Sequence, residues 1–175
     1  MKKNDHAVAF VTGASSGLGK ATATRLAEAG YKVFGTSRRG ASASPSSLEM
    51  LPLDVTSDAS VKAAVAEVIR REGRLDLLVN NAGFNVAVGG AEESSIQQAQ
   101  DIFDTNFFGI VRMTLAVVPH MRHQGRGRII NIGSIQSLMH VRTPSSAAYT
   151  ASKHGVLGFT RALAAELGKD GVRVN

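Results

Sequence analysis

Tyr149 and Lys153 form the pair of residues in this sequence whose types and spacing suggest catalysis. Residues four apart in a helix lie on one face, one turn from each other. A free phenol has a pKa of about 10, and a positive charge beside it favours the phenolate. Such a tyrosine can give a proton to a carbonyl oxygen or take one from a hydroxyl. Because this spacing also occurs by chance on surface helices, its meaning depends on whether a cofactor site and an oxyanion partner accompany it.

The composition is that of a globular protein with one domain. The chain has 175 residues, of which 43% are hydrophobic and 19% are charged, so it can build a real core. It contains no cysteine, which excludes disulfides, thiolate zinc sites and cysteine nucleophiles, and we expect no metal site. No secretory signal and no apolar run long enough to cross a bilayer are evident, so we expect a cytoplasmic protein without a membrane span.

The net charge of +6 allows two interpretations. One is a nucleic-acid-binding protein. The other is a basic enzyme that uses a few arginines to hold an anionic cofactor. Because the positive charges are scattered and aromatic residues make up only 5% of the chain, we favour the enzyme and expect no nucleic-acid partner.

A glycine-rich turn lies between a predicted strand at residues 7–12 and a predicted helix that ends near Glu28. Strand, glycine turn and helix in this order are the context of a dinucleotide fingerprint. The backbone amides of such a turn approach a pyrophosphate, which then sits on the helix N-terminus. We predict that the residues of the turn bind the cofactor: Gly13, Ser15, Ser16, Gly17, Leu18 and Gly19.

The second predicted strand, residues 32–36, leads into Ser37-Arg38-Arg39. In an NAD site an acidic residue usually stands near this point and holds the ribose 2′-hydroxyl. A carboxylate repels a 2′-phosphate, whereas a hydroxyl and a guanidinium bind it. We therefore predict that Ser37 and Arg38 make the protein prefer NADP(H) over NAD(H). A solvated basic loop is the alternative.

Strands and helices alternate along the whole chain. Further strands are predicted at residues 49–53, 75–79, 128–132 and 172–175. Helices are predicted at residues 57–72, at 95–121 with a break near 94–101 and a kink at Pro119, and from 149 to about 167. The expected fold is a Rossmann-type, doubly wound parallel sheet in three α/β/α layers, with strand order 3-2-1-4-5-6, that stops at the sixth strand. Residues 1–175 form a single domain on this interpretation.

Several motifs then follow one another in order: Thr12-Gly13-x-x-x-Gly17-x-Gly19, Asp54-Val55, Asn80-Asn81-Ala82-Gly83, Asn106, Gly133-Ser134 and Tyr149-x-x-x-Lys153. Together they resemble the short-chain dehydrogenase/reductase family, in its short single-domain branch, over almost the whole chain. The segments 104–109 and 127–134 are similar to those of hydroxysteroid and retinol dehydrogenase-like members.

The resemblance implies four catalytic residues. Tyr149 is the general acid in carbonyl reduction and the base in alcohol oxidation. Lys153 assists it electrostatically and binds the hydroxyls of the nicotinamide ribose. Ser134 donates a hydrogen bond to the substrate oxygen, although Ser137 is an alternative because the spacing from Ser134 to Tyr149 is about two residues longer than is usual. Asn106 holds a water that links Lys153 to solvent.

The resemblance also implies contacts to the rest of the cofactor, which Tyr149 and Lys153 bind as well. Asp54 binds the adenine amino group and Val55 contributes backbone. Asn81, Ala82 and Gly83 pass beneath the adenine ribose. Thr12 braces the turn that begins at Asn80.

These roles imply an NADP(H)-dependent oxidoreductase of the CH–OH/C=O class (EC 1.1.1.-) that acts on a small carbonyl or alcohol substrate. A cofactor-binding module without turnover, in redox sensing or as a scaffold, is the alternative.

Family members usually continue past the sixth strand with a helical lid over the substrate and a last strand. We therefore expect the chain to be a fragment, or to be inactive as written. The helices around Asn106 and Tyr149 commonly pack against partner subunits, so we expect a homodimer or homotetramer.

Overall fold

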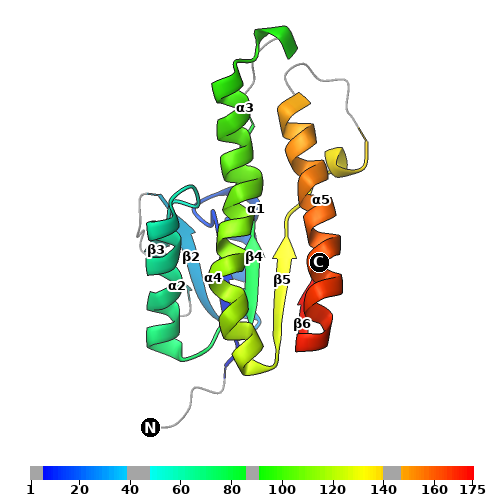
Figure 1. Cartoon of the computed structure of the whole chain (residues 1–175). Helices are drawn as coiled ribbons and strands as arrows, with labels where there is room; N and C mark the ends of the chain where they lie inside the picture. Colours follow the sequence, from blue (N-terminus) through cyan, green and yellow to red (C-terminus); the bar gives the residue numbers. More distant parts are fainter. Residues whose placement is uncertain (1–5, 39–47, 86–90, 140–146) are drawn as a thin grey trace.

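Six short parallel strands form the sheet at the centre of the molecule (Figure 1). The computed structural model describes residues 6–38, 48–85, 91–139 and 147–175. Arg39, the Ser/Ala-rich segment 40–47 and part of the lengthened stretch between Ser134 and Tyr149 lie outside this part. The order β3-β2-β1-β4-β5-β6 confirms the predicted doubly wound sheet. The strands are β1 (Val8–Val11), β2 (Lys32–Ser37), β3 (Leu48–Pro52), β4 (Leu77–Asn80), β5 (Gly127–Asn131) and β6 (Val172–Val174).

Helices cover both faces of the sheet and complete three layers (Figure 1). On one face α1 (Gly17–Glu28) places Ala23 in a core cluster with alternate residues of β1, β2 and β4. The opposite face is covered by α2 (Asp58–Glu72), α4 (Gly109–Gln124) and α5 (Ala147–Leu167), whose buried residues share a second cluster with the strands. Burial on both sides explains why the central strands β1 and β4 have nearly continuous apolar sequences.

The ends of α2 show how local sequence sets an element. Ser57 is the N-cap, and its hydroxyl oxygen accepts a hydrogen bond from the backbone N–H of Ser60. Gly73 ends the helix with a φ of 69°, a left-handed conformation that costs glycine little. Between the caps, Val61 and Val65 face the core. The prediction of this helix from its apolar stripe is therefore confirmed.

The predicted long helix is interrupted, but at a different place from the one expected. Ser95 begins α3 (Ile96–Phe103) with a capping box, so the segment around residues 95–101 is regular. A single π-helical turn, Asp104–Phe108, separates α3 from α4. Such turns are rare and are frequently found at functional sites. The break predicted near residues 94–101 was wrong, and the irregular turn is the one that contains Asn106.

No apolar run long enough to cross a bilayer was expected, but the helical run from Ile96 to Gln124 has that length and composition. It contains 29 residues with a hydropathy of 1.3 over its most apolar window, which is long and apolar enough to cross a bilayer. Met113, Val117 and Met121 of this run are fully buried in the core shared with the sheet. Of the most apolar window, 39% is buried, so packing in the core accounts for part of its apolar character.

The outer strands of the sheet are β3 and β6, each paired on one side among the described residues. Pro52 ends β3, as predicted for an edge strand, and the N–H of Leu53 donates to the carbonyl of Ser37 on β2. Because backbone groups alternate along a strand, the missing N–H of Pro52 is one that would face away from the sheet. The strand β6 is three residues long and carries the exposed Arg173 at its centre.

Candidate active site

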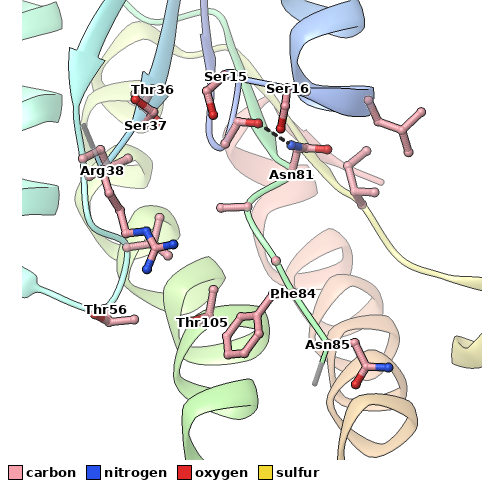
Figure 2. A pocket seen from close by; sticks show the side chains of 18 of the residues that line it. Ser15, Ser16, Thr36, Ser37, Arg38, Thr56, Asn81, Phe84, Asn85 and Thr105 are labelled. Carbon is pink, nitrogen blue, oxygen red and sulfur yellow. Dashed lines mark hydrogen bonds between the residues drawn. The ribbon is translucent and has the colours of Figure 1, made fainter. Parts of the chain in front are cut away.

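One cleft of about 1030 Å³ opens at the carboxyl ends of the strands. This is the edge at which a doubly wound sheet binds its ligand, beside the point where the strand order reverses between β1 and β4. Of the predicted site residues, Gly17 and Asn106 do not line the cleft. Those that do are Gly13, Ser15, Ser16, Leu18, Gly19, Ser37, Arg38, Asp54, Val55, Asn81, Ala82, Gly83, Ser134, Tyr149 and Lys153 (Figure 2 labels several of them).

The glycine turn leaves room for a ligand against the start of α1. Gly13 has a φ of 66°, and a Cβ on it would lie 3.0 Å from the Cα of Ala82. A Cβ on Gly19 would overlap the carbonyl oxygen of Gly13. The N-cap Ser16 makes no side-chain capping bond, and the first turn of α1 has no acidic residue. Unpaired backbone N–H groups at a helix N-terminus attract an anion, so these residues fit a dinucleotide pyrophosphate.

The turn after β4 is bound tightly to the glycine turn. The hydroxyl oxygen of Thr12 accepts hydrogen bonds from the backbone N–H groups of Asn81 and Ala82, each 3.0 Å long. The Asn81 side-chain amide donates to the carbonyls of Thr12 and Gly13, at 3.0 and 3.1 Å. These bonds fix the floor of the cleft, and they provide the bracing contact expected of Thr12.

The end of β2 and the loop after β3 form the opposite wall. The exposed Arg38 side chain extends into the cleft on the side of Thr56 (Figure 2). Asp54 Oδ1 accepts hydrogen bonds from the Thr56 backbone N–H (2.9 Å) and hydroxyl (2.7 Å). Both bonds lower the pKa of Asp54, and the bond from the Thr56 backbone has the larger effect. The nearby positive charge of Arg38 lowers this pKa further. Asp54 is therefore a carboxylate whose acceptor oxygens can bind an amino group.

Asn106 lies behind the cleft rather than in its wall. Its side chain is fully buried in the π-helical turn. Oδ1 accepts a hydrogen bond from the backbone N–H of Phe84, and Nδ2 donates to the Phe84 carbonyl, both at 2.9 Å. Nδ2 is also 3.4 Å from the Ser152 hydroxyl oxygen. The side chain thus holds the chain just after Gly83 against α5.

Ser134, and not Ser137, faces the cleft. Ser134 is the N-cap of the short turn η3 (Ile135–Ser137), and its Oγ accepts a hydrogen bond of 3.2 Å from the Gln136 backbone N–H. Ser137 is only 5% exposed, and its Oγ accepts a bond from the Ser134 backbone N–H. The structure therefore favours Ser134 over the alternative left open by the sequence.

Tyr149 and Lys153 meet on the first turns of α5. Both line the cleft, and Lys153 Nζ lies 5.7 Å from the centre of the Tyr149 ring. Nζ donates a 2.7 Å hydrogen bond to the carbonyl of Ile132, just after β5. The Lys153 side chain is 5% exposed, and this burial lowers the pKa of its ammonium group. The proposed proton donor, its cationic neighbour and Ser134 thus share one wall.

Several residues of the cleft were not predicted. Gln136 and Thr56 each follow a predicted residue by two positions, so closeness to a motif was their only signal. Phe84, Asn85 and Thr105 also line the cleft, and their side-chain types suggested no role (Figure 2).

A doubly wound sheet with a glycine turn, an anion-binding helix end and a tyrosine–lysine pair in one cleft defines a dinucleotide-binding protein of the dehydrogenase type. The sequence profile of the short chain dehydrogenases matches residues 7–175. The chain therefore belongs to the short chain dehydrogenase family.

Proteins of similar sequence and structure include reductases and a dehydrogenase, which fits this assignment. The 3-ketodihydrosphingosine reductase of Bacteroides thetaiotaomicron is 45% identical over 161 residues, which cover 91% of this chain and 58% of that protein. The 3-oxoacyl-acyl-carrier-protein reductase FabG of Vibrio cholerae is 41% identical and covers 96% of this chain and 70% of its own length. The crystal structure of a short-chain dehydrogenase from Streptomyces avermitilis superimposes with a TM-score of 0.88 at 37% identity, over 97% of this chain and 63% of that one. The chain thus spans less than two thirds of some of these relatives.

Proposed function

We propose that this protein is an NADP(H)-dependent oxidoreductase that interconverts a ketone and a secondary alcohol. The observation that carries the proposal is that Ser134, Tyr149 and Lys153 line the same cleft as the glycine turn. The bound reduced coenzyme supplies a hydride to the carbonyl carbon. A proton must then reach the carbonyl oxygen, so that ketone, hydride and proton together give the alcohol. Relatives named as reductases support this reaction class.

Different side chains of the cleft transfer the proton to the substrate oxygen, donate a hydrogen bond to it and stabilise the resulting phenolate. Tyr149 gives its phenolic proton to the carbonyl oxygen, or takes the hydroxyl proton in the reverse direction. The Ser134 oxygen already accepts a bond from the Gln136 N–H, so its own hydrogen is available to the substrate oxygen as negative charge develops there. The buried Lys153 ammonium stabilises the phenolate that Tyr149 becomes and binds ribose hydroxyls.

The remaining residues hold the coenzyme within a single domain of residues 1–175. The glycine turn would hold the pyrophosphate, Asp54 and Val55 would hold the adenine, and the residues from Asn81 to Gly83 would hold its ribose. Asn106, whose side chain is engaged with Phe84 and Ser152, would hold the water of the proton relay that links Lys153 to solvent. A cytoplasmic location is part of this proposal, and the absence of cysteine is compatible with a reducing compartment.

The test is the oxidation of NADPH and of NADH in the presence of a panel of ketones. We expect ketone-dependent oxidation with both coenzymes and a higher kcat/KM for NADPH. A higher kcat/KM for NADH contradicts the roles of Ser37 and Arg38. Tight NADPH binding without turnover of any ketone favours the cofactor-binding module instead.

Arg38→Leu isolates the coenzyme preference. A charged hydrogen bond is worth about 1.5–3 kcal/mol, so its loss lowers the ratio of kcat/KM for NADPH over NADH by about 10- to 100-fold. Arg25→Leu removes an exposed guanidinium of α1 that lies outside the cleft, and it leaves this ratio at the wild-type value.

We also propose that the protein is a homodimer or homotetramer. The helices α3 and α4 expose large apolar side chains, with Ile96 77% and Leu115 70% exposed. An apolar hollow of about 470 Å³ along α3 and the π-helical turn is lined by Phe103 and Phe108. Exposed apolar surface of this kind marks contact sites. Sedimentation equilibrium is expected to give at least twice the mass of the chain, and a purely monomeric profile contradicts the proposal.

A further inference from the structure

Gln136 occupies a position in the cleft that the reaction described above leaves unused. It belongs to η3, two residues after Ser134, and its half-buried side chain lines the cleft together with Ser134 and Tyr149. A side chain between these two groups borders the place where a carbonyl being reduced must lie. Whatever is attached to that carbonyl therefore passes close to Gln136.

The Gln136 carboxamide is fixed from the α5 side. The Thr150 hydroxyl donates a hydrogen bond of 2.6 Å to Gln136 Oε1. Thr150 is the residue after Tyr149, so this bond ties η3 to the helix turn that carries the tyrosine. The backbone N–H of Gln136 holds the Ser134 oxygen on the other side. Gln136 is thus held between Ser134 and Thr150, the residue next to Tyr149.

This arrangement leaves a specific donor. With Oε1 occupied by Thr150, the polar group that remains on the carboxamide is the Nε2 amide, which carries two N–H donors. Within the described ranges no protein acceptor pairs with it. An uncharged N–H donor suits an uncharged oxygen acceptor, such as a carbonyl, ester or hydroxyl oxygen.

We propose that Gln136 is a specificity-determining residue that binds a second oxygen of the substrate. The favoured substrates are ketones with another oxygen acceptor a few bonds from the reacting carbonyl. This inference rests on the proposed function, because Ser134 and Tyr149 must hold the first oxygen. It selects among ketones and adds no step to the reaction.

The experiment compares ethyl acetoacetate, which has a ketone and an ester oxygen, with hexan-2-one, which has the ketone alone. The measured quantity is the ratio of their kcat/KM values with NADPH. Gln136→Leu is expected to lower this ratio by about 3- to 10-fold, the effect of one lost neutral hydrogen bond. Gln136→Glu keeps the shape of the side chain and an oxygen for Thr150 but replaces the donor, and it lowers the ratio at least as much.

Two further variants separate this role from a general effect on folding. Thr150→Val removes the bond that orients the carboxamide and gives a smaller fall in the ratio. Gln97→Leu changes an exposed glutamine of α3 that does not line the cleft, and it leaves the ratio unchanged. An unchanged ratio in Gln136→Leu, or equal losses of kcat/KM for both ketones, overturns the inference.

A binding measurement distinguishes failure of this inference from failure of the proposed function. In a Tyr149→Phe background, the dissociation constant of ethyl acetoacetate from the NADPH complex is expected to rise about 3- to 10-fold on adding Gln136→Leu. If wild-type protein reduces neither ketone but this rise is found, the function fails and the Gln136 contact stands. If both ketones are reduced and no rise is found, the function stands and the Gln136 contact fails.

Discussion

Tyr149→Phe is expected to lower kcat for ketone reduction by about 100- to 10,000-fold, the range over which a positioned general acid acts. The substitution removes one oxygen and keeps the ring, so the packing of α5 and the contact with Lys153 are retained. Binding of NADPH, followed by the change in its fluorescence, therefore stays close to wild type. A loss of kcat with coenzyme binding retained identifies the missing group as a proton donor.

The chain offers a matched control for this substitution. Tyr31 is the other of the two tyrosines in the chain, and its partly buried ring packs beside the core cluster under α1, outside the cleft. Tyr31→Phe removes the same oxygen and leaves kcat at the wild-type value. Turnover by Tyr149→Phe at the rate of Tyr31→Phe would remove the basis of the catalytic assignment.

Lys153→Met is expected to lower kcat by about 100-fold or more, because the charge that stabilises the phenolate is lost from a buried site. Lys153→Arg keeps a positive charge and recovers part of the activity. Lys62→Met removes an exposed lysine of α2 and leaves kcat unchanged. Equal activity of Lys153→Met and Lys62→Met would contradict the role of the buried ammonium.

The buried Lys153 also predicts how the free energy of unfolding changes with pH. Burial lowers the pKa of Lys153 below the ordinary value of 10.5. Between the lowered pKa and 10.5 the unfolded chain binds more protons at this group than the folded protein does. Its contribution to the free energy of unfolding therefore rises with pH through that interval and is lost as pH falls through the folded pKa. Urea unfolding between neutral pH and about pH 10 should show this rise in wild type and not in Lys153→Met.

The parts of the site that could be predicted from sequence are those fixed by short-range geometry. The glycine turn joins a strand to a helix within a few residues, so its spacing alone predicts where backbone amides are exposed. The pair Tyr149 and Lys153 depends only on the period of a helix. Strand order followed from the alternation of strands and helices, because right-handed crossovers leave few arrangements.

The contacts that sequence could not supply join segments distant in the chain. Asn106 reaches the backbone of Phe84 across 22 residues, and Gln136 reaches Thr150 across 14. Which polar atoms such side chains meet depends on the path of the loops between them. The π-helical turn is a similar case: the run from Ile96 to Gln124 has no glycine or proline near Asp104 except Gly109 to mark it.

The outer side of β3 bears on how copies of this chain can associate. Pro52 offers no amide hydrogen to a strand from another molecule at this border of the sheet. A proline there therefore discourages an added strand. Growth of the sheet from one molecule into the next, the route toward fibres, is thereby disfavoured along β3.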